Sequence, residues 1–492
     1  MQKERSLKFN FIMNSLLTVS SIIFPLITFP YVSRILLPEG NGKVSFVASV
    51  VAYFSMLSQL GIPTYGIRAC AKVRNNKEEL SRTVHELFII NLIMSLWVYF
   101  IFACSLYLVP QFREEKTLFI ITSLTIIFNA IGVEWLYKGL EQYAYITVRS
   151  IIFKFIALVA TFLLIHQQSD YEIYAAISIF AGSASNVLNF IHAHKYVTVK
   201  PVGHYHMKQH IKPVCIFFAM SCASTIYTNL DVVMLGFLNG NIEVGYYNAA
   251  IKIKTILVSV ITSLGAVMLP RASYYVEQGM NAEFIRLARK AVHFVILVAM
   301  PVMTYFIYFA KEGILFLSGK EFEASILPMQ IIMPTLLLIG LTNIMGIQIL
   351  IPMGKEKIVL YSEIAGACVN LAINFILIPR MASCGAAIGT LAAEVVVWIV
   401  QYTALKKVVA EMYKKLKYIP VLIALTLGSA VSLWVKSFPF IDFFKLIISS
   451  VLFFGCYILV LIAFKEPLIL EMKRGFVRIM QKAVNRKSNF PG

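Results

Sequence analysis

Apolar stretches of about 18 to 25 residues recur along the whole chain and alternate with short polar segments. A helix needs about 20 apolar residues to cross the hydrocarbon core of a bilayer, so each stretch is long enough for one crossing. The pattern predicts an all-α membrane protein with about fourteen transmembrane helices. They are expected near residues 11–33, 43–62, 86–109, 117–137, 148–166, 173–193, 214–237, 246–268, 291–311, 326–351, 359–378, 386–405, 419–436 and 443–464.

Composition supports this reading. Of the 492 residues, 59% are hydrophobic and 14% are charged, whereas soluble domains carry about 25% charged residues. The net charge of +19 could suggest nucleic acid or an anionic membrane as a partner. Because the basic residues lie between apolar stretches and near the C-terminus, we expect an anionic inner leaflet and no nucleic acid.

The distribution of Lys and Arg predicts the orientation. With the N-terminus inside, the inner connecting segments hold more than three times as many Lys and Arg as the outer segments. This positive-inside bias predicts that both termini are cytoplasmic. Residues 466–492 alternate apolar and basic side chains, which is typical of an amphipathic helix on anionic lipid; a solvated basic tail is the alternative.

Two segments share a repeated pattern. ILLPEGNGKV begins at Ile35 and MLGFLNGNIEVG begins at Met234; the alignment that places Gly42 on Gly245 also places Arg68 on Arg271. We predict two parallel bundles of six helices, residues 1–210 and 211–410. Two extra helices in 411–465 and the tail 466–492 follow them. Such halves enclose a cavity that rocking opens to either side, as in a transporter.

Three charges fall inside the predicted helices near the second repeat. A charge in the membrane costs roughly 2.5 to 3.5 kcal/mol on insertion scales and needs a partner, water or a ligand. Asp231 and Lys252 both lie about 9 Å below the outer turn, so they can form a salt bridge. Lys254 is rotated by about 200° from Lys252, so it either snorkels to the headgroups or lies in the cavity.

The first half holds a similar group of charges. Glu134, Glu141, Arg149 and Lys154 cluster around an inner turn, and Lys154 is deep enough to need a wet or paired site. Arg149, and Arg34 at the outer end of the first span, could be headgroup anchors or cavity residues. If they face the cavity, it is net cationic and suits the phosphate head of a lipid. The candidate substrate-binding residues are Arg34, Arg68, Arg149, Lys154, Lys252, Lys254 and Arg271.

Metal and enzyme chemistry find no support in the pattern. The histidines between residues 192 and 210 match no zinc spacing, and neither a cysteine nor an acid accompanies them, so no metal or cofactor is expected. A membrane enzyme such as a glycan polymerase or acyltransferase needs catalytic residues in a sizeable loop. The outer segments are short and lack a His and carboxylate grouping, so we expect no enzyme.

Two segments carry a family likeness. WLYKGLEQYAYITVRS, residues 135–150, resembles the W-x-x-x-G-x-E segment with a downstream arginine of bacterial polysaccharide flippases of the Wzx type. NLDVVMLGFLNGNIEVGYYNAAIKI, residues 229–253, resembles the same family's D-x-x-x-L-G and G-Y-Y-x-x-A-x-K-I pattern. The matching residues are Trp135, Gly139, Glu141, Arg149, Asp231, Gly236, Gly245, Tyr246, Tyr247 and Lys252.

The resemblance implies a multidrug, oligosaccharidyl-lipid and polysaccharide exporter with twelve to fourteen helices in two halves. It implies a flippase in the bacterial cell membrane that moves undecaprenyl-diphosphate-linked repeat units to the outer leaflet for O-antigen, capsule or similar glycans. Glycan polymerase machinery is a candidate partner. Coupling to a H⁺ or Na⁺ gradient is suspected, with Glu134, Glu141 and Asp231 as candidates.

Two alternatives share the expected fold. A lipid II flippase would use the same lipid carrier with a different head. A multidrug and toxin extrusion type exporter usually takes cations, which a lysine-bearing cavity should repel.

Overall fold

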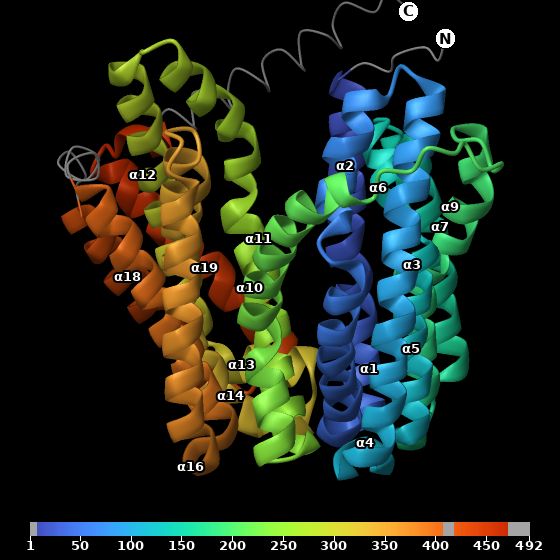
Figure 1. The fold of residues 1–492 in the computed structure, drawn as a ribbon. Helices are drawn as coiled ribbons and strands as arrows, with labels where there is room; N and C mark the ends of the chain where they lie inside the picture. Colours follow the sequence, from blue (N-terminus) through green and yellow to red (C-terminus); the bar gives the residue numbers. More distant parts are fainter. Residues whose placement is uncertain (1–6, 407–417, 471–492) are drawn as a thin grey trace, which may run out of the picture. The chain divides into compact units, whose positions relative to one another are not determined.

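The computed structural model describes residues 7–406 and 418–470. Every regular element in these ranges is helical, which confirms the predicted all-α class (Figure 1). The longer helices are α1 (Leu7–Gln59), α2 (Ile62–Val73), α3 (Lys77–Leu108), α5 (Lys116–Ile131), α7 (Tyr143–Leu164), α8 (Tyr171–Ile179), α10 (Lys208–Leu238), α11 (Asn241–Glu277), α12 (Asn281–Tyr308), α15 (Thr335–Asn343), α16 (Glu356–Ala404), α18 (Tyr418–Leu433) and α19 (Asp442–Ala463).

Shorter elements connect or extend them. They are α4 (Pro110–Glu114), α6 (Glu134–Gly139), η1 (Gln168–Asp170), η2 (Phe180–Ala184), α9 (Asn186–His192), η3 (Ala193–Lys195), α13 (Ala310–Leu317), η4 (Lys320–Ser325), α14 (Ile326–Ile332), η5 (Ile344–Leu350) and η6 (Trp434–Ser437). In the described part of the chain, ten helices are long and apolar enough to cross a membrane, or eleven if one bent pair is a single span. The chain is therefore a multi-pass membrane protein.

Helices α1 and α16 are each too long for one crossing. A straight helix of 53 residues, the length of α1, would extend about 80 Å, against a hydrocarbon core of about 30 Å. Non-helical backbone interrupts α1 at Leu37 and α16 at Ala382. Pro38 explains the first break, because a proline disfavours the helical region for the residue before it.

Both breaks fall between predicted spans, so the predicted positions agree with these helices. The predicted number of fourteen transmembrane helices stays a prediction. The ten or eleven helices found here are identified by length and composition alone, and α5 is too short to be among them.

The chain forms two compact units that interleave along the sequence. Unit 1 consists of residues 1–249, 317–324 and 367–389, and unit 2 consists of residues 250–316, 325–366 and 390–492. The predicted boundaries at residues 210, 410 and 465 were drawn from the sequence repeat, whereas these units are defined by compactness. The predicted boundaries therefore stay predictions. Residues 471–492, most of the predicted amphipathic tail, lie outside the described residues.

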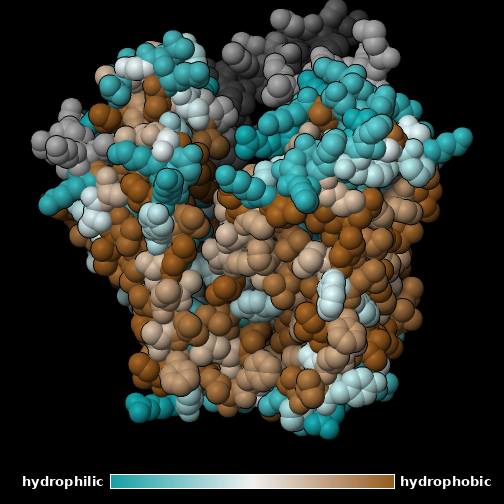
Figure 2. Space-filling model, in the orientation of Figure 1, coloured by the Kyte–Doolittle hydropathy of each residue, from teal (hydrophilic) through white to brown (hydrophobic). Residues whose placement is uncertain are grey.

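Unit 1 is organised around α1, which packs against α3, α5, α7 and α10. One core cluster lies where α2, α3 and α6 meet and includes Ile62, Leu80 and Leu136. The outward face of α3 instead exposes large apolar side chains, such as Leu96 and Phe100. Figure 2 shows apolar side chains over the middle of the helices and polar ones gathered at their ends, as a bilayer requires.

Unit 2 has its own core. Tyr305 and Phe309 near the end of α12 pack with Phe453 and Tyr457 of α19 and with Ala424 of α18. The Tyr305 hydroxyl donates to the backbone oxygen of Leu446 at 2.9 Å, which ties α12 to α19.

Residues related by the repeat meet inside unit 1. A Cβ on Gly42 would lie 1.7 Å from the backbone oxygen of Asn241, and a Cβ on Gly245 would lie 2.0 Å from the backbone oxygen of Pro38. The alignment that pairs Gly42 with Gly245 also pairs Pro38 with Asn241. The contact is therefore reciprocal, as a two-fold repeat produces, and it brings backbone against backbone.

Residues 317–324, another second-half segment of unit 1, also pack on the first half. The Ser33 hydroxyl donates to the backbone oxygen of Leu317 at 3.2 Å, and Gly319 lies against the stem of Arg34. Residues 317–324 and the break in α16 both belong to the end of the helices that the positive-inside pattern places outside. Within unit 1, the ends of the two predicted halves that this pattern places outside therefore pack on each other.

Candidate functional site

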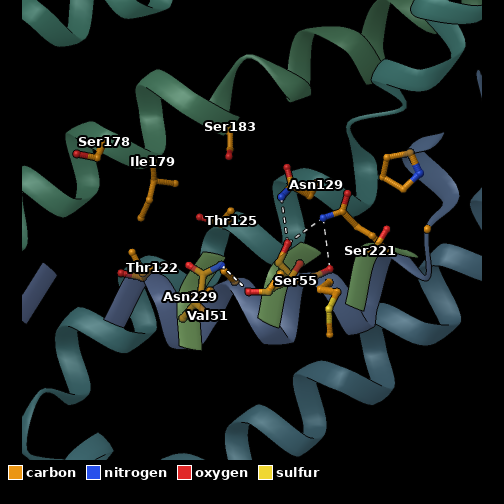
Figure 3. A pocket seen from close by; sticks show the side chains of 17 residues that line it. Val51, Ser55, Thr122, Thr125, Asn129, Ser178, Ile179, Ser183, Ser221 and Asn229 are labelled. Atoms are coloured by element: carbon orange, nitrogen blue, oxygen red, sulfur yellow. Dashed lines mark hydrogen bonds between the residues drawn. The ribbon is translucent and has the colours of Figure 1, made fainter. Parts of the chain in front are cut away.

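A pocket of about 530 Å³ lies inside unit 1, between helices α1, α5, α8 and α10 (Figure 3). None of the described residues that line it is charged. Its lining combines hydroxyls and amides with small apolar side chains. The lining residues are Ala48, Val51, Ala52, Ser55, Met56, Gln59, Gly61, Pro63, Thr122, Thr125, Asn129, Ser178, Ile179, Ser183, Ser221, Thr225 and Asn229.

Each helix contributes one stripe of its surface to the pocket. The α10 residues Ser221, Thr225 and Asn229 are spaced four apart, so they lie above one another on a single helix face. On α5, Thr122, Thr125 and Asn129 are spaced three and four apart, so they also share one helix face. Sequence reasoning missed these residues because it weighed only charges. Polar uncharged side chains at helical spacing inside apolar spans were the available signal.

A network of hydrogen bonds holds the polar side of the pocket around Ser55. The side-chain amides of Gln59 and Asn129 donate to Ser55 Oγ at 2.9 and 3.2 Å. Behind them, Asn186 Nδ2 donates to Asn129 Oδ1 at 3.3 Å, and Asn189 Nδ2 donates to Asn186 Oδ1 at 3.3 Å. Because Ser55 Oγ accepts two bonds, its own proton is oriented by the network for donation elsewhere.

The wall formed by the sixth predicted span departs from regular α-helix. Between α8 and α9 the backbone forms the π-helical turn η2, and Ser183 of this turn lines the pocket. Such turns are rare and frequently occur at functional sites. Figure 3 shows Ser178, Ile179 and Ser183 on one side of the pocket, facing Thr125 and Asn129.

The pocket can hold a polar, uncharged ligand. It offers hydroxyls, which donate and accept, and side-chain amides, which do both at separate atoms. Its volume falls within the range of about 300–1,000 Å³ that is usual for small-molecule sites. Polar groups at this density are costly in an apolar bundle, so water or a ligand must satisfy them.

Asp231 forms a second polar site in unit 1. Its Oδ1 accepts a hydrogen bond from Asn374 Nδ2 at 2.6 Å, and its Oδ2 accepts one from the Tyr247 hydroxyl at 2.5 Å. Asn374 Nδ2 also donates to Asn370 Oδ1 at 3.0 Å. All four side chains are buried. This cluster joins α10, α11 and α16, and its oxygens suit a proton or a small cation. The predicted salt bridge with Lys252 stays a prediction.

The other two acidic candidates lie in ion pairs near the inner turn. Glu134 pairs with Lys138 at 2.8 Å and contacts Arg149 at 3.5 Å. Glu141 pairs with Arg74 at 3.0 Å on the surface. Both acids are engaged with basic partners. Asp231 accepts hydrogen bonds from the uncharged side chains of Tyr247 and Asn374.

The basic candidates of the first half occupy different environments. Arg149 is buried, with the Tyr145 ring 5.7 Å from its Cζ, and among described residues its Nε and Nη1 have no hydrogen-bond partner. Lys154 donates to the hydroxyls of Ser20 and Ser21 on α1, at 3.1 and 2.7 Å. Arg34 and Arg68 are exposed.

The remaining basic candidates belong to unit 2. Lys252 and Lys254 are partly buried on α11, and Arg271 near the end of the same helix is exposed. None of the seven basic candidates lines the described pocket. Their role as substrate ligands stays a prediction.

The family motifs are explained largely by packing. A Cβ on Gly66 would lie 2.7 Å from the Trp135 ring, and one on Gly139 would lie 2.9 Å from Cys70 Cβ, so these residues press α6 onto α2. A Cβ on Gly236 would lie 2.1 Å from the Phe46 ring. Tyr247 differs, because it binds Asp231 directly.

The chain is similar to several known proteins. The family described as "Polysaccharide biosynthesis protein" matches residues 7–276, and the MatE family matches residues 217–376. Two curated relatives share the name "Putative O-antigen transporter". The Escherichia coli (strain K12) protein is 24% identical over 80% of this chain and 95% of its own length. The Shigella dysenteriae protein is 27% identical over 81% of this chain and 100% of its own length.

Two solved structures share the fold. The lipid II flippase MurJ, in an inward closed conformation, superposes with a TM-score of 0.75 at 16% identity and covers 93% of this chain and 100% of its own. An inward-facing multidrug resistance MATE family transporter gives a TM-score of 0.61 at 14% identity and covers 83% of this chain and 100% of its own. At these identities the likeness concerns the fold alone, and it confirms the predicted all-α membrane fold.

Proposed function

Because the chain belongs to the polysaccharide biosynthesis protein family, whose match covers more than half of its length, we propose that it flips undecaprenyl-diphosphate-linked oligosaccharide repeat units. The broader class of function, a flippase or transporter of lipid-linked polysaccharide, follows from the family and from the two O-antigen transporter relatives. The relatives and structural neighbours are transporters, which confirms the prediction that the chain is not an enzyme. The transfer would run from the inner to the outer leaflet of the bacterial cell membrane, with both termini cytoplasmic.

The uncharged polar pocket of unit 1 is the observation that supports this proposal most directly. Sugars present hydroxyls that donate and accept hydrogen bonds, and the pocket walls present complementary hydroxyls and amides. A lipid-linked glycan needs such a wet, polar compartment among apolar helices while its lipid tail stays in the bilayer. The product would serve O-antigen, capsule or a similar glycan, with glycan polymerase machinery as its next partner.

The outer closure of unit 1 supports alternating access. The reciprocal contact of Gly42 with Gly245, and the bond between Ser33 and Leu317, join the outer ends of the two predicted halves. A transporter must break such a closure to release substrate on the outer side. We assign this contact the role of the outer gate.

The diphosphate would bind to basic side chains of the first half. Among described residues, Arg149 Nε and Nη1 are buried without a hydrogen-bond partner, and Lys154 donates to serine hydroxyls of the neighbouring helix α1. Charge-assisted bonds from such groups suit phosphate oxygens. Arg34, Arg68, Lys252, Lys254 and Arg271 remain candidates for the same role.

Asp231 is the candidate for coupling to a H⁺ or Na⁺ gradient. A buried carboxylate in a membrane bundle is costly, and protonation or cation binding lowers that cost. Asn374 Nδ2 donates to both Asp231 Oδ1 and Asn370 Oδ1, so the Asn370 oxygen is a candidate second ligand for a cation at this carboxylate. Glu134 and Glu141 are further candidates; Glu134 pairs with Lys138, and Glu141 pairs with Arg74.

Transport of a fluorescent undecaprenyl-diphosphate-linked oligosaccharide by the purified chain in vesicles would test the proposal. The readout is the fraction of label that becomes accessible to a membrane-impermeant quencher. Thr125→Val combined with Asn229→Leu removes two polar groups from the pocket with little change of volume and should slow transport at least tenfold. Thr426→Val, on the exposed face of α18, is the matched control.

The same vesicles would test the alternatives. Lipid II and a cationic drug replace the oligosaccharide lipid as substrates. Faster transport of either one would overturn the proposed substrate in favour of a lipid II flippase or a multidrug exporter.

A further inference from the structure

We infer that the pocket of unit 1 selects an uncharged sugar, a hexose or an N-acetylated amino sugar, and rejects sugars that carry a carboxylate. The inference rests on the proposed function and specifies the glycan that this site takes. It follows from the chemistry of the lining, which differs from the cationic cavity that the sequence predicts.

The first argument is charge. No Lys, Arg or His is among the described residues of the lining, so a carboxylate that entered would have no opposite charge. Moving an ion from water into a site without a counter-charge is strongly unfavourable, even where hydrogen bonds are available. An uncharged sugar avoids this cost.

The nearest described charge on the same helix supplies no counter-charge either. Asp231 follows the lining residue Asn229 by two positions on α10, so it is rotated by about 200° away from the lining face, and it is an acid. The buried basic residue Arg149 contacts Glu134 and is not part of the lining.

The second argument is the pattern of donors and acceptors. Ser55 Oγ accepts from both Gln59 and Asn129, so its proton is available to a ligand oxygen. Thr122, Thr125 and the α10 hydroxyls can each donate or accept. Sugar hydroxyls have the same dual capacity, whereas a carboxylate only accepts and leaves acceptors in the wall unpaired.

The third argument is the apolar part of the wall. Ala48, Val51 and Ala52 of α1 lie on one helix face, with Met56 one turn further along, and Ile179 is on another wall. Their methyl groups suit the C–H face of a pyranose ring and the methyl of an N-acetyl group. The described lining has no aromatic ring, so hydrogen bonds and these methyl contacts carry the recognition.

The test compares two synthetic undecaprenyl-diphosphate-linked disaccharides that differ at one carbon. One ends in glucose and the other in glucuronic acid, so a CH₂OH group is exchanged for a carboxylate. The purified chain in vesicles should transport the neutral lipid at least tenfold faster. Equal rates, or faster transport of the acid, overturn the inference and leave the flippase function standing. Transport of neither lipid, with folded protein, overturns both.

A charge placed in the pocket gives a second, independent readout. Thr125→Lys, and separately Thr225→Lys, put an ammonium at the wall and should raise the rate of the acidic lipid relative to the neutral one at least fivefold. Ser169→Lys adds the same charge at an exposed outer turn and should leave the preference unchanged. An unchanged preference in both folded pocket variants contradicts the inference.

Discussion

The contact between Gly42 and Gly245 allows a prediction whose size follows from the structure. Gly245→Ala adds one methyl group whose carbon would lie 2.0 Å from the backbone oxygen of Pro38. A carbon and a carbonyl oxygen in contact are usually separated by about 3.3–3.6 Å. The helices must therefore move apart by about 1.3 Å or more at this point. The same argument gives a larger movement for Gly42→Ala, whose Cβ would lie 1.7 Å from the oxygen of Asn241.

Overpacking of this kind usually costs about 1–3 kcal/mol. If the cost falls on the outer-closed state alone, each 1.4 kcal/mol shifts the balance toward the open state tenfold. We therefore expect a shift of about 5-fold to 150-fold. Since transport needs both states, the rate of flipping should also fall.

The assay measures how readily the pocket is reached from outside. Asn229→Cys, in a background without other cysteines, is labelled by a membrane-impermeant maleimide in right-side-out vesicles. Gly245→Ala should speed labelling, and Gly455→Ala should not, because a Cβ on Gly455 meets nothing within 4 Å. Unchanged labelling together with normal transport would refute the gate.

Three further predictions concern other parts of unit 1. Asp231→Asn should remove the dependence of transport on an imposed H⁺ or Na⁺ gradient in vesicles; transport that still follows the gradient assigns coupling elsewhere. Arg149→Gln and Lys154→Gln should each weaken binding of inorganic diphosphate to the purified chain, measured by calorimetry, and unaltered affinity would remove that residue from the phosphate site. Gly139→Ala should lower the melting temperature, since its Cβ would lie 2.9 Å from Cys70 Cβ; Gly182→Ala, with open space, is the control, and an equal effect of both would contradict the packing argument.

The helices could be predicted from the sequence because a bilayer sets their length. Most apolar stretches of the required length coincide with helix in the described residues, although 117–137 is interrupted at Gly132 and Val133 and 326–351 at Met333 and Pro334. The turn at Leu37 falls where Pro38 disfavours continued helix. The repeat was also visible, since Gly42 and Gly245 align. The alignment could not show that these two glycines are in contact, because matching two segments of sequence does not tell how far apart they lie in the folded chain.

The pocket could not be predicted in the same way. Helical spacing tells which residues share a face, but it does not tell which helices face one another. Ser55 and Asn129 meet only because α1 packs on α5, and Asn186 joins them from a third segment. Charges such as Lys154 are conspicuous in an apolar span, whereas serines and threonines are common there because they bond to their own helix backbone.

The difference between the basic residues and the uncharged pocket matters for a substrate that has a charged diphosphate and an uncharged sugar. A diphosphate needs opposite charge, and a sugar needs hydrogen-bonding groups without charge, so a single uniform cavity serves neither well. The described structure separates the two: the basic candidates of the first half lie outside the pocket, and the pocket is neutral. If both sites act on one molecule, removing the basic groups should weaken binding of every lipid diphosphate equally. Changes in the pocket should instead alter which sugar is accepted, and this difference separates the two roles experimentally.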